Sequence, residues 1–190
     1  MAPVKIEPSD ALVIVDPQND FLPGGSLAVA DGNRIFEPIN LVMPLFEHVL
    51  ATRDWHPEDH AYFEHNGGIW PLHCLADSQG AEFSPLLDTT HIELVMSKGT
   101  DPDTDGYSAF AGTDLAEQLH TRGVKRLFIC GLATDYCVKM TSIEAKHYGF
   151  EAFVLTDAAA AVNLKPNDEA NALADMQGHG VTLMSTAELH

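Results

Sequence analysis

The sequence is poor in cysteine and in long apolar runs. Its 190 residues include three cysteines, Cys74, Cys130 and Cys137. A small, odd number of cysteines is not the pattern of a disulfide-rich secreted domain, so we expect a reducing compartment, the cytoplasm. No apolar run approaches the roughly 20 residues of a membrane-spanning helix, and the N-terminus has no apolar signal core.

Positive charge is also scarce. The chain has 10 Lys and Arg residues against 28 Asp and Glu residues, a formal net charge of -18. A surface of this sign repels phosphate groups, which disfavours nucleic acid and anionic membranes as partners. Apolar residues, in contrast, make up 45% of the chain. That fraction is enough for the core of a single domain over residues 1–190.

Short apolar runs alternate with helical patterns along the chain. The apolar runs predict six strands, at residues 11–15, 49–52, 92–96, 124–130, 152–155 and 181–184. Helices are expected at residues 33–46, 113–121, 134–147 and 167–176, and prolines weaken the first of them. This alternation predicts an α/β fold with a mostly parallel, Rossmann-like six-stranded sheet and helices on both faces.

The stretch LFICGLATDYCVKMTSIEA, residues 127–145, contains a candidate nucleophile. Its apolar run ends at Gly131, and Thr134 or Asp135 is suited to cap a following helix. Cys137 would then lie in the first helical turn, where the helix dipole lowers the pKa of a thiol. The alternative is that Cys137 is an ordinary small buried residue, and its position alone does not decide between the two.

Other reactive side chains follow the predicted strands at their carboxyl ends, where parallel sheets bind ligands. Asp16 follows the first strand, Asp54 and His56 follow the second, and Lys98 follows the third. Considered alone, Asp16 would be interpreted as a loop cap and Lys98 as a surface charge. A carboxylate, an amine and a thiol at one edge favour a nucleophilic Cys137, with Asp16 accepting its proton and Lys98 pairing with both charges.

A second set of side chains has the chemistry of a metal site. Asp54 and His56 are two residues apart, so on an extended chain they turn to the same side, and His73 would complete the set. Two imidazoles and a carboxylate suit one divalent ion, Zn, Mn or Fe, with positions open to water or substrate. His60 and Glu64 are weaker candidates for a further ligand or for hydrogen bonds to bound water.

Three aromatic residues, Phe21, Trp70 and Tyr107, belong to loops that leave the same edge of the predicted sheet. Aromatic side chains on loops can line a pocket for a flat ring. Packing beneath the loops is the alternative, and it is the preferred interpretation when only the residue types are considered.

Taken together, these motifs resemble the nicotinamidases of the isochorismatase-like cysteine hydrolase superfamily. The resemblance extends from about residue 11 to the end of the chain, and the Asp-Trp-His segment with the later Trp-Pro-x-His-Cys is its most specific part. The matching stretches are VIVDPQNDFLPGGSLAV from Val13, TRDWHPEDH from Thr52, GGIWPLHC from Gly67, GAEF from Gly80, KGTDPDTDGYSAF from Lys98 and CGLATDYCVKMT from Cys130.

The resemblance implies an activity and the residues that perform it. It implies that Asp16, Lys98 and Cys137 form a catalytic triad that hydrolyses nicotinamide, and also pyrazinamide, through a cysteine thioester. This reaction belongs to NAD salvage. The resemblance further implies a cis peptide bond before Ala133, which would direct the N–H groups of Ala133 and Cys137 to one point as an oxyanion hole.

The same resemblance assigns the remaining candidates. It implies that Asp54, His56 and His73 bind the metal ion, most often zinc, and that the three loop aromatics line the nicotinamide ring. The pyridine nitrogen would lie on the metal. Members of the superfamily range from monomers to larger assemblies, so a homo-oligomer is compatible with the resemblance.

Four other functions compete with this hypothesis. Isochorismatases and hydrolases of carbamoyl or ureido compounds share the triad but need no metal at Asp54, His56 and His73. A non-catalytic binding protein with the same fold would not need an intact triad. A cysteine protease would need a histidine next to the thiol, and the sequence offers none at a strand end beside Cys137.

Overall fold

The protein is described by a computed structural model that covers residues 3–190, so residues 1 and 2 of the expected domain lie outside the described residues. Six strands form one sheet in the order β3-β2-β1-β4-β5-β6, and each neighbouring pair is parallel. The predicted sheet is therefore confirmed. The strands are β1 (Asp10–Val15), β2 (His48–Asp54), β3 (Leu94–Lys98), β4 (Arg126–Leu132), β5 (Glu151–Ala160) and β6 (Thr182–Met184).

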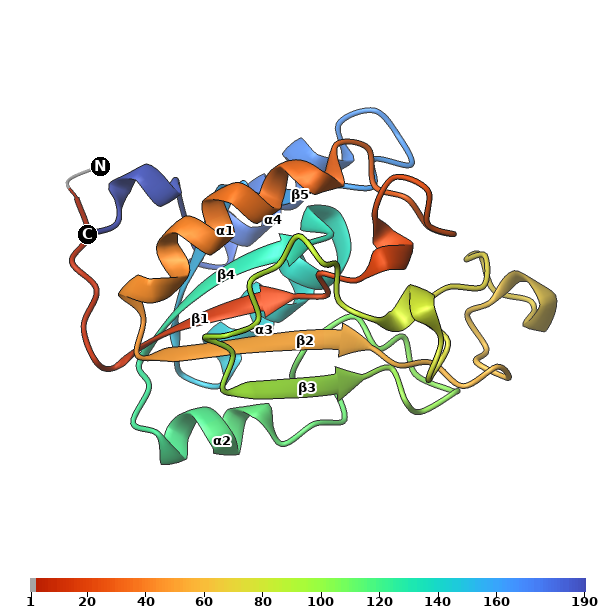
Figure 1. The fold of residues 1–190 in the computed structure, drawn as a ribbon, viewed down its shortest axis with the longest axis horizontal. Helices are drawn as coiled ribbons and strands as arrows, with labels where there is room; N and C mark the ends of the chain where they lie inside the picture. Colours follow the sequence, from red (N-terminus) through yellow and green to blue (C-terminus); the bar gives the residue numbers. More distant parts are fainter. Residues whose placement is uncertain (1–2) are drawn as a thin grey trace.

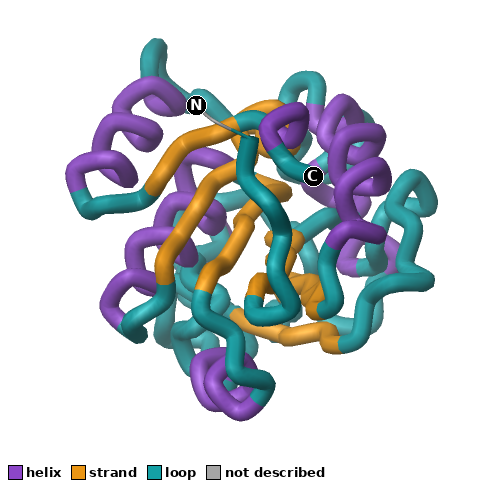
Figure 2. The backbone as a smooth tube through the Cα atoms, turned by 90° about the vertical axis from the view of Figure 1, so that its left-hand side faces the viewer, coloured by secondary structure: helices purple, strands orange, loops and turns teal. Residues whose placement is uncertain are grey.

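Helices cover both faces of this sheet, as predicted (Figures 1 and 2). The side chains of β1 alternate between the two layers: Leu12 and Ile14 pack in the core beneath α1, whereas Val13 packs on the opposite side with α2 and α3. All three side chains are fully buried. The helices are α1 (Phe36–Val42), α2 (Leu115–Thr121), α3 (Lys139–His147) and α4 (Asp168–Gly178).

Two predicted helices differ from the observed ones. The helix expected at residues 33–46 is shortened to α1, between 3-10 turns at Gly32–Ile35 and Met43–Leu45; Pro44 lies in the second of these turns. The helix expected from residue 134 begins with a π-helical turn, Thr134–Val138, which leads into α3. Its N-cap residue is Ala133, so the predicted capping by Thr134 or Asp135 is wrong.

Gly131 allows β4 to approach β1 closely just before that turn. It has a φ of +109°, and a Cβ atom there would lie 2.1 Å from the carbonyl oxygen of Val15. The pairing of β4 with β5 shifts register between Ile129 and Gly131. A larger residue at 131 would push the strands apart, so this glycine fixes where β4 ends relative to β1.

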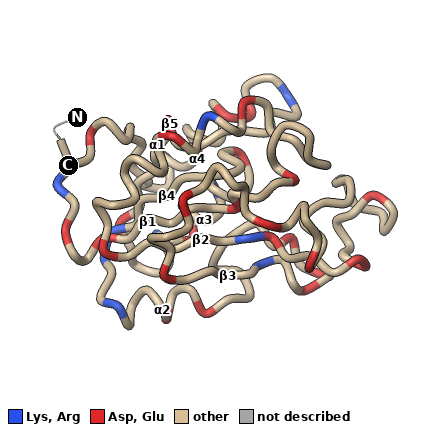
Figure 3. The backbone as a smooth tube through the Cα atoms, viewed as in Figure 1, with Lys and Arg blue, Asp and Glu red and all other residues tan. Residues whose placement is uncertain are grey.

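Acidic residues are spread over strands, helices and loops, whereas Lys and Arg are few (Figure 3). The three cysteines are all buried and free. Within residues 3–190, no helix is both long enough and apolar enough to cross a membrane.

Candidate active site

The carboxyl edge of the sheet brings the predicted reactive side chains together. Asp16 follows β1, Asp54 ends β2, Lys98 ends β3, and Cys137 lies in the π-helical turn after β4. All four are buried, none with more than 6% of its surface exposed. Oxygen atoms of the two carboxylates and the Sγ atom of Cys137 lie within 4.8 Å of one another.

The ammonium group of Lys98 lies at the centre of this cluster. Its Nζ atom is 2.8 Å from Asp16 Oδ2, 2.5 Å from Asp54 Oδ1 and 3.4 Å from Cys137 Sγ, and it donates to the carbonyl oxygen of Gly106 at 2.9 Å. Burial lowers the pKa of Lys98, but the two carboxylates outweigh it and raise the pKa well above its usual value. The lysine is therefore charged and neutralises part of the acidic cluster.

Burial also raises the pKa values of the Asp16 carboxyl group and the Cys137 thiol. It raises the pKa of Asp16 to about 6, although Lys98 acts in the opposite direction. It raises the pKa of Cys137 well above that of a free thiol, and Lys98 offsets this only in part. The prediction of a lowered thiol pKa is therefore wrong, because desolvation outweighs the helix terminus. Such a thiol is protonated at rest and needs a neighbouring base to react.

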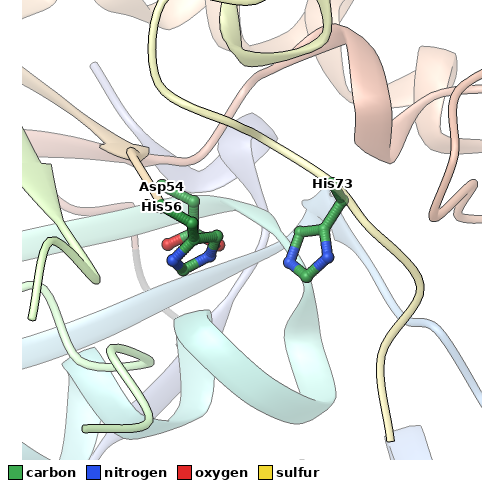
Figure 4. Close-up of side chains that lie close together, drawn as sticks. All are labelled: Asp54, His56 and His73. Atoms are coloured by element: carbon green, nitrogen blue, oxygen red, sulfur yellow. The ribbon is translucent and has the colours of Figure 1, made fainter. Parts of the chain in front are cut away.

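Asp54 also belongs to a second group, which it forms with His56 and His73. Their ligand atoms lie within 4.8 Å of one another, and Figure 4 shows His73 facing Asp54 and His56 from its own segment of chain. The Nδ1 atoms of His56 and His73 lie 2.8 Å from the carbonyl oxygens of Gly99 and Pro71. A carbonyl only accepts, so each Nδ1 carries a hydrogen, and when the ring is neutral its Nε2 has the lone pair that a metal ion needs.

The donor set of this group fits a divalent metal ion. One carboxylate and two imidazole rings converge, and a backbone carbonyl orients each ring through its Nδ1. Burial lowers the pKa of His73, which favours the neutral ring that binds metal. Burial raises the pKa of Asp54, but Lys98 and His56 outweigh it and hold that pKa well below its usual range.

The two weaker ligand candidates occupy different environments. His60 is 1% exposed, its ring centroid lies 4.4 Å from that of His56, and its Nε2 has no hydrogen-bond partner among the described residues. Its Nδ1 accepts from the Tyr62 N–H at 3.3 Å, so metal binding through Nε2 would require this weak contact to be lost. Glu64 is exposed on a 3-10 turn, outside the group.

The predicted aromatic residues surround a cavity of about 30 Å³ next to Cys137. Phe21, Trp70 and Tyr107 line it together with Ala133. The Nε1 of Trp70 donates to the hydroxyl of Tyr107 at 2.9 Å, which ties two loops together over the cavity. The peptide bond before Ala133 is cis, as the resemblance implied.

Sequence reasoning missed several residues of this site. Tyr136 lines the cavity, and its ring lies 5.0 Å from that of Trp70; its place beside the nucleophile candidate was an available signal. Gln18 accepts from the Asp54 N–H at 2.7 Å and donates to its carbonyl at 2.8 Å. Val162 also lines the cavity. No sequence pattern marks Gln18 or Val162 as part of the site, because the residues that they contact are remote in the chain.

Comparison with known proteins identifies the family. The isochorismatase domain family matches residues 10–188. The chain belongs to the isochorismatase family. The membership expected from the motifs is thus confirmed, and so is the α/β fold that this family shares with its solved members.

Relatives of this isochorismatase-family chain include enzymes of known activity. It is 37% identical to nicotinamidase of Escherichia coli, over 95% of this chain and 97% of that one. Among solved structures, it resembles PnC1 from L. infantum in complex with nicotinate, with a TM-score of 0.94 and 38% identity over 99% and 98% of the two chains. It also resembles pyrazinamidase of Pyrococcus horikoshii in complex with zinc, with a TM-score of 0.88 and 44% identity over 94% and 99%.

Proposed function

We propose that this protein hydrolyses nicotinamide to nicotinate and ammonia, and pyrazinamide in the same way, as a step of NAD salvage in the cytoplasm. The observation that carries the proposal is the buried thiol of Cys137, which lies between a carboxylate–lysine pair and an aromatic-lined cavity. The nicotinamidase relatives and the nicotinate-bound PnC1 support this choice of substrate.

The chemistry begins with a proton transfer between Asp16 and Cys137. The Asp16 carboxylate accepts the thiol proton, and the thiolate attacks the amide carbon. Lys98 stabilises the negative charge during this step because its ammonium group lies 3.4 Å from Sγ. Asp16 then gives the proton to the leaving nitrogen, which departs as ammonia and leaves a thioester.

Hydrolysis of the thioester uses the same groups in reverse order. Asp16, now ionised, accepts a proton from water, and the resulting hydroxide attacks the thioester carbonyl. The thiolate of Cys137 leaves and recovers the proton from Asp16, which completes the cycle. In both halves the oxyanion would be bound by the backbone N–H groups of Ala133 and Cys137, an interaction type that contributes about 3–4 kcal/mol elsewhere.

A metal ion would be held by Asp54, His56 and His73. When bound, a divalent ion supplies a Lewis acid that can anchor a pyridine nitrogen and orient the ring. Zinc is the proposed ion, supported by the zinc-bound pyrazinamidase. The aromatic residues Phe21 and Trp70 would hold the ring between this group and the nucleophile.

The test is ammonia release from nicotinamide by the purified protein, with its metal content determined first by mass spectrometry. We expect turnover that falls on chelation and returns with a divalent ion. Cys137→Ala should abolish turnover, whereas Cys130→Ala, which removes a buried thiol of the β4 core, should retain it. Turnover by Cys137→Ala near the wild-type rate would exclude the thioester mechanism.

Other outcomes separate the competing functions. Bound metal without amidase activity on nicotinamide or pyrazinamide would contradict the proposed substrate. Activity on a ureido compound, without metal, would place the chain with the metal-independent hydrolases of its family. Neither metal nor turnover of any amide would favour a non-catalytic binding protein.

A further inference from the structure

One buried carboxylate connects the turn that carries Cys137 with the segment that follows β5. Asp135 is 6% exposed. Its Oδ1 accepts from the N–H of Val162 at 2.9 Å, and its Oδ2 accepts from the N–H of Asn163 at 2.8 Å. These partners are 27 and 28 residues away along the chain. The carboxylate therefore makes a tertiary contact rather than a cap of its own turn.

The two N–H groups lie where the chain leaves the sheet. β5 ends at Ala160, so Val162 and Asn163 lie beyond the strand. Asn163 adopts a φ of +54°, and its side-chain oxygen accepts from the N–H of Glu169 at 2.9 Å, which directs the chain toward α4. Both hydrogen bonds are partly shielded from water, and through them Asp135 pairs the backbone N–H groups of two consecutive residues.

The segment held in this way forms a wall between two spaces. On one side, Val162 and Tyr136 line the cavity of about 30 Å³ that contains Cys137. On the other side, Asp135, Tyr136 and Leu164 line an open groove of about 720 Å³. The side chain of Val162 packs against the core cluster that contains Phe21 and Ala133, whereas Leu164 faces the open groove. The hydrogen bonds from the N–H groups of Val162 and Asn163 to Asp135 therefore add a polar anchor to the backbone of this segment.

We propose that Asp135 is a positioning residue for this wall: its carboxylate holds Val162 against the cavity and so limits the ring substituents that the site accepts. The inference rests on the proposed function, because it concerns the ring of an aromatic amide. One methyl group more or less in an apolar pocket changes relative kcat/KM by about 10–200-fold. A small displacement of Val162 is therefore measurable as a change in selectivity.

The experiment compares nicotinamide with a series of nicotinamides that carry one methyl group at each free ring carbon. Asp135→Asn keeps the side-chain shape but turns an NH₂ group toward a backbone N–H, and Val162→Ala shortens the wall directly. We expect both variants to raise kcat/KM for at least one methylated amide, relative to nicotinamide, by about tenfold or more. Asp175→Asn removes a charge from the same groove without touching residues 162–163, and it should leave the ratio unchanged.

Two results would overturn the proposal. One is an equal loss of kcat/KM for every amide in Asp135→Asn. The other is an unchanged ratio of kcat/KM between the methylated amides and nicotinamide in Val162→Ala. This second variant tests the proposal even if Asp135→Asn does not fold.

Hydrogen exchange gives a readout that needs no substrate. The amides of Val162 and Asn163 should exchange faster in Asp135→Asn than in the wild type or in Asp175→Asn. Unchanged exchange would show that the Asp135 carboxylate does not hold these two residues. If the wild type releases no ammonia from nicotinamide, the proposed function fails. The exchange rates still test separately whether Asp135 holds Val162 and Asn163.

Discussion

The hydroxyl of Thr52 donates a hydrogen bond of 2.7 Å to Oδ1 of Asp16, and it also lies 3.2 Å from the Asp16 N–H as an acceptor. Thr52 is 1% exposed, so this contact is shielded from water. It occupies one oxygen of the carboxylate, while the other oxygen lies 2.8 Å from the ammonium group of Lys98. Thr52 therefore orients the group that we propose as the proton acceptor.

This contact predicts a pH effect. The pKa of Asp16, raised by burial to about 6, should set the acid limb of kcat/KM, because the base is lost as pH falls through that value. The Thr52 hydrogen bond lowers this pKa, so Thr52→Val should raise it and move the acid limb to higher pH. Thr52→Ser keeps the hydroxyl and should keep the wild-type limb. An identical profile for Thr52→Val would contradict the assignment of Asp16 as the base.

The position of Lys98 predicts that its charge is indispensable. Lys98→Met would leave the carboxylates of Asp16 and Asp54 buried without their cation. Breaking a buried ion pair typically costs about 3–5 kcal/mol, and removing one donor that stabilises developing negative charge lowers kcat by about 10²–10³-fold in other enzymes, which is the size of loss that we expect here. Thermal unfolding and steady-state kinetics measure the two effects. Lys139→Met is the control, because it changes a half-buried lysine of the open groove lined by Asp135. This variant should lose neither stability nor kcat.

Metal binding is predicted to depend on His73. His73→Ala removes one of three converging ligands, and we expect zinc affinity to fall by more than about 100-fold, measured by competition with a chromophoric chelator. His65→Ala changes an exposed imidazole of the same loop, whose Nε2 lies 3.0 Å from the carbonyl oxygen of Glu58, and this variant should bind zinc as the wild type does. Equal affinities for the two variants would remove His73 from the metal site.

Much of this site could be predicted from the sequence because its main residues stand at strand ends. Asp16, Asp54 and Lys98 follow or end apolar runs, and the order of strands in a parallel sheet brings those ends to one edge. The local sequence pattern and the fold class are therefore sufficient to predict that these three residues lie close together. The cis peptide bond before Ala133 was implied by the family resemblance, and no periodicity in the sequence would indicate it.

The residues that support the site could not be predicted in this way. Thr52 and Asp16 are 36 residues apart, and Asp135 and Val162 are 27 apart. Their contacts depend on strand register and on where β5 ends. The sequence also misled on the thiol of Cys137, since a helix terminus can be predicted from a motif whereas the extent of desolvation depends on the packed structure.

Stability should depend on an ion pair at the opposite end of β1. Asp10 is fully buried, and its carboxylate accepts from the Nε of Arg126 on β4 at 2.7 Å and from the N–H of Glu7 at 2.7 Å. Asp10→Asn removes the negative charge and places an NH₂ donor where a carboxylate oxygen accepts from an N–H group. We expect a loss of about 2–3 kcal/mol in the free energy of unfolding, less than for a fully buried pair because Arg126 is partly exposed.

Urea denaturation of Asp10→Asn and Glu7→Gln tests this expectation. Glu7→Gln removes an exposed carboxylate that pairs with Lys5 at 3.1 Å, and such surface pairs contribute about 0–1 kcal/mol. Its backbone N–H still donates to Asp10, so Glu7→Gln should unfold at nearly the wild-type urea concentration. Equal midpoints for both variants would mean that the Asp10–Arg126 pair does not stabilise the joined ends of β1 and β4, whatever its geometry.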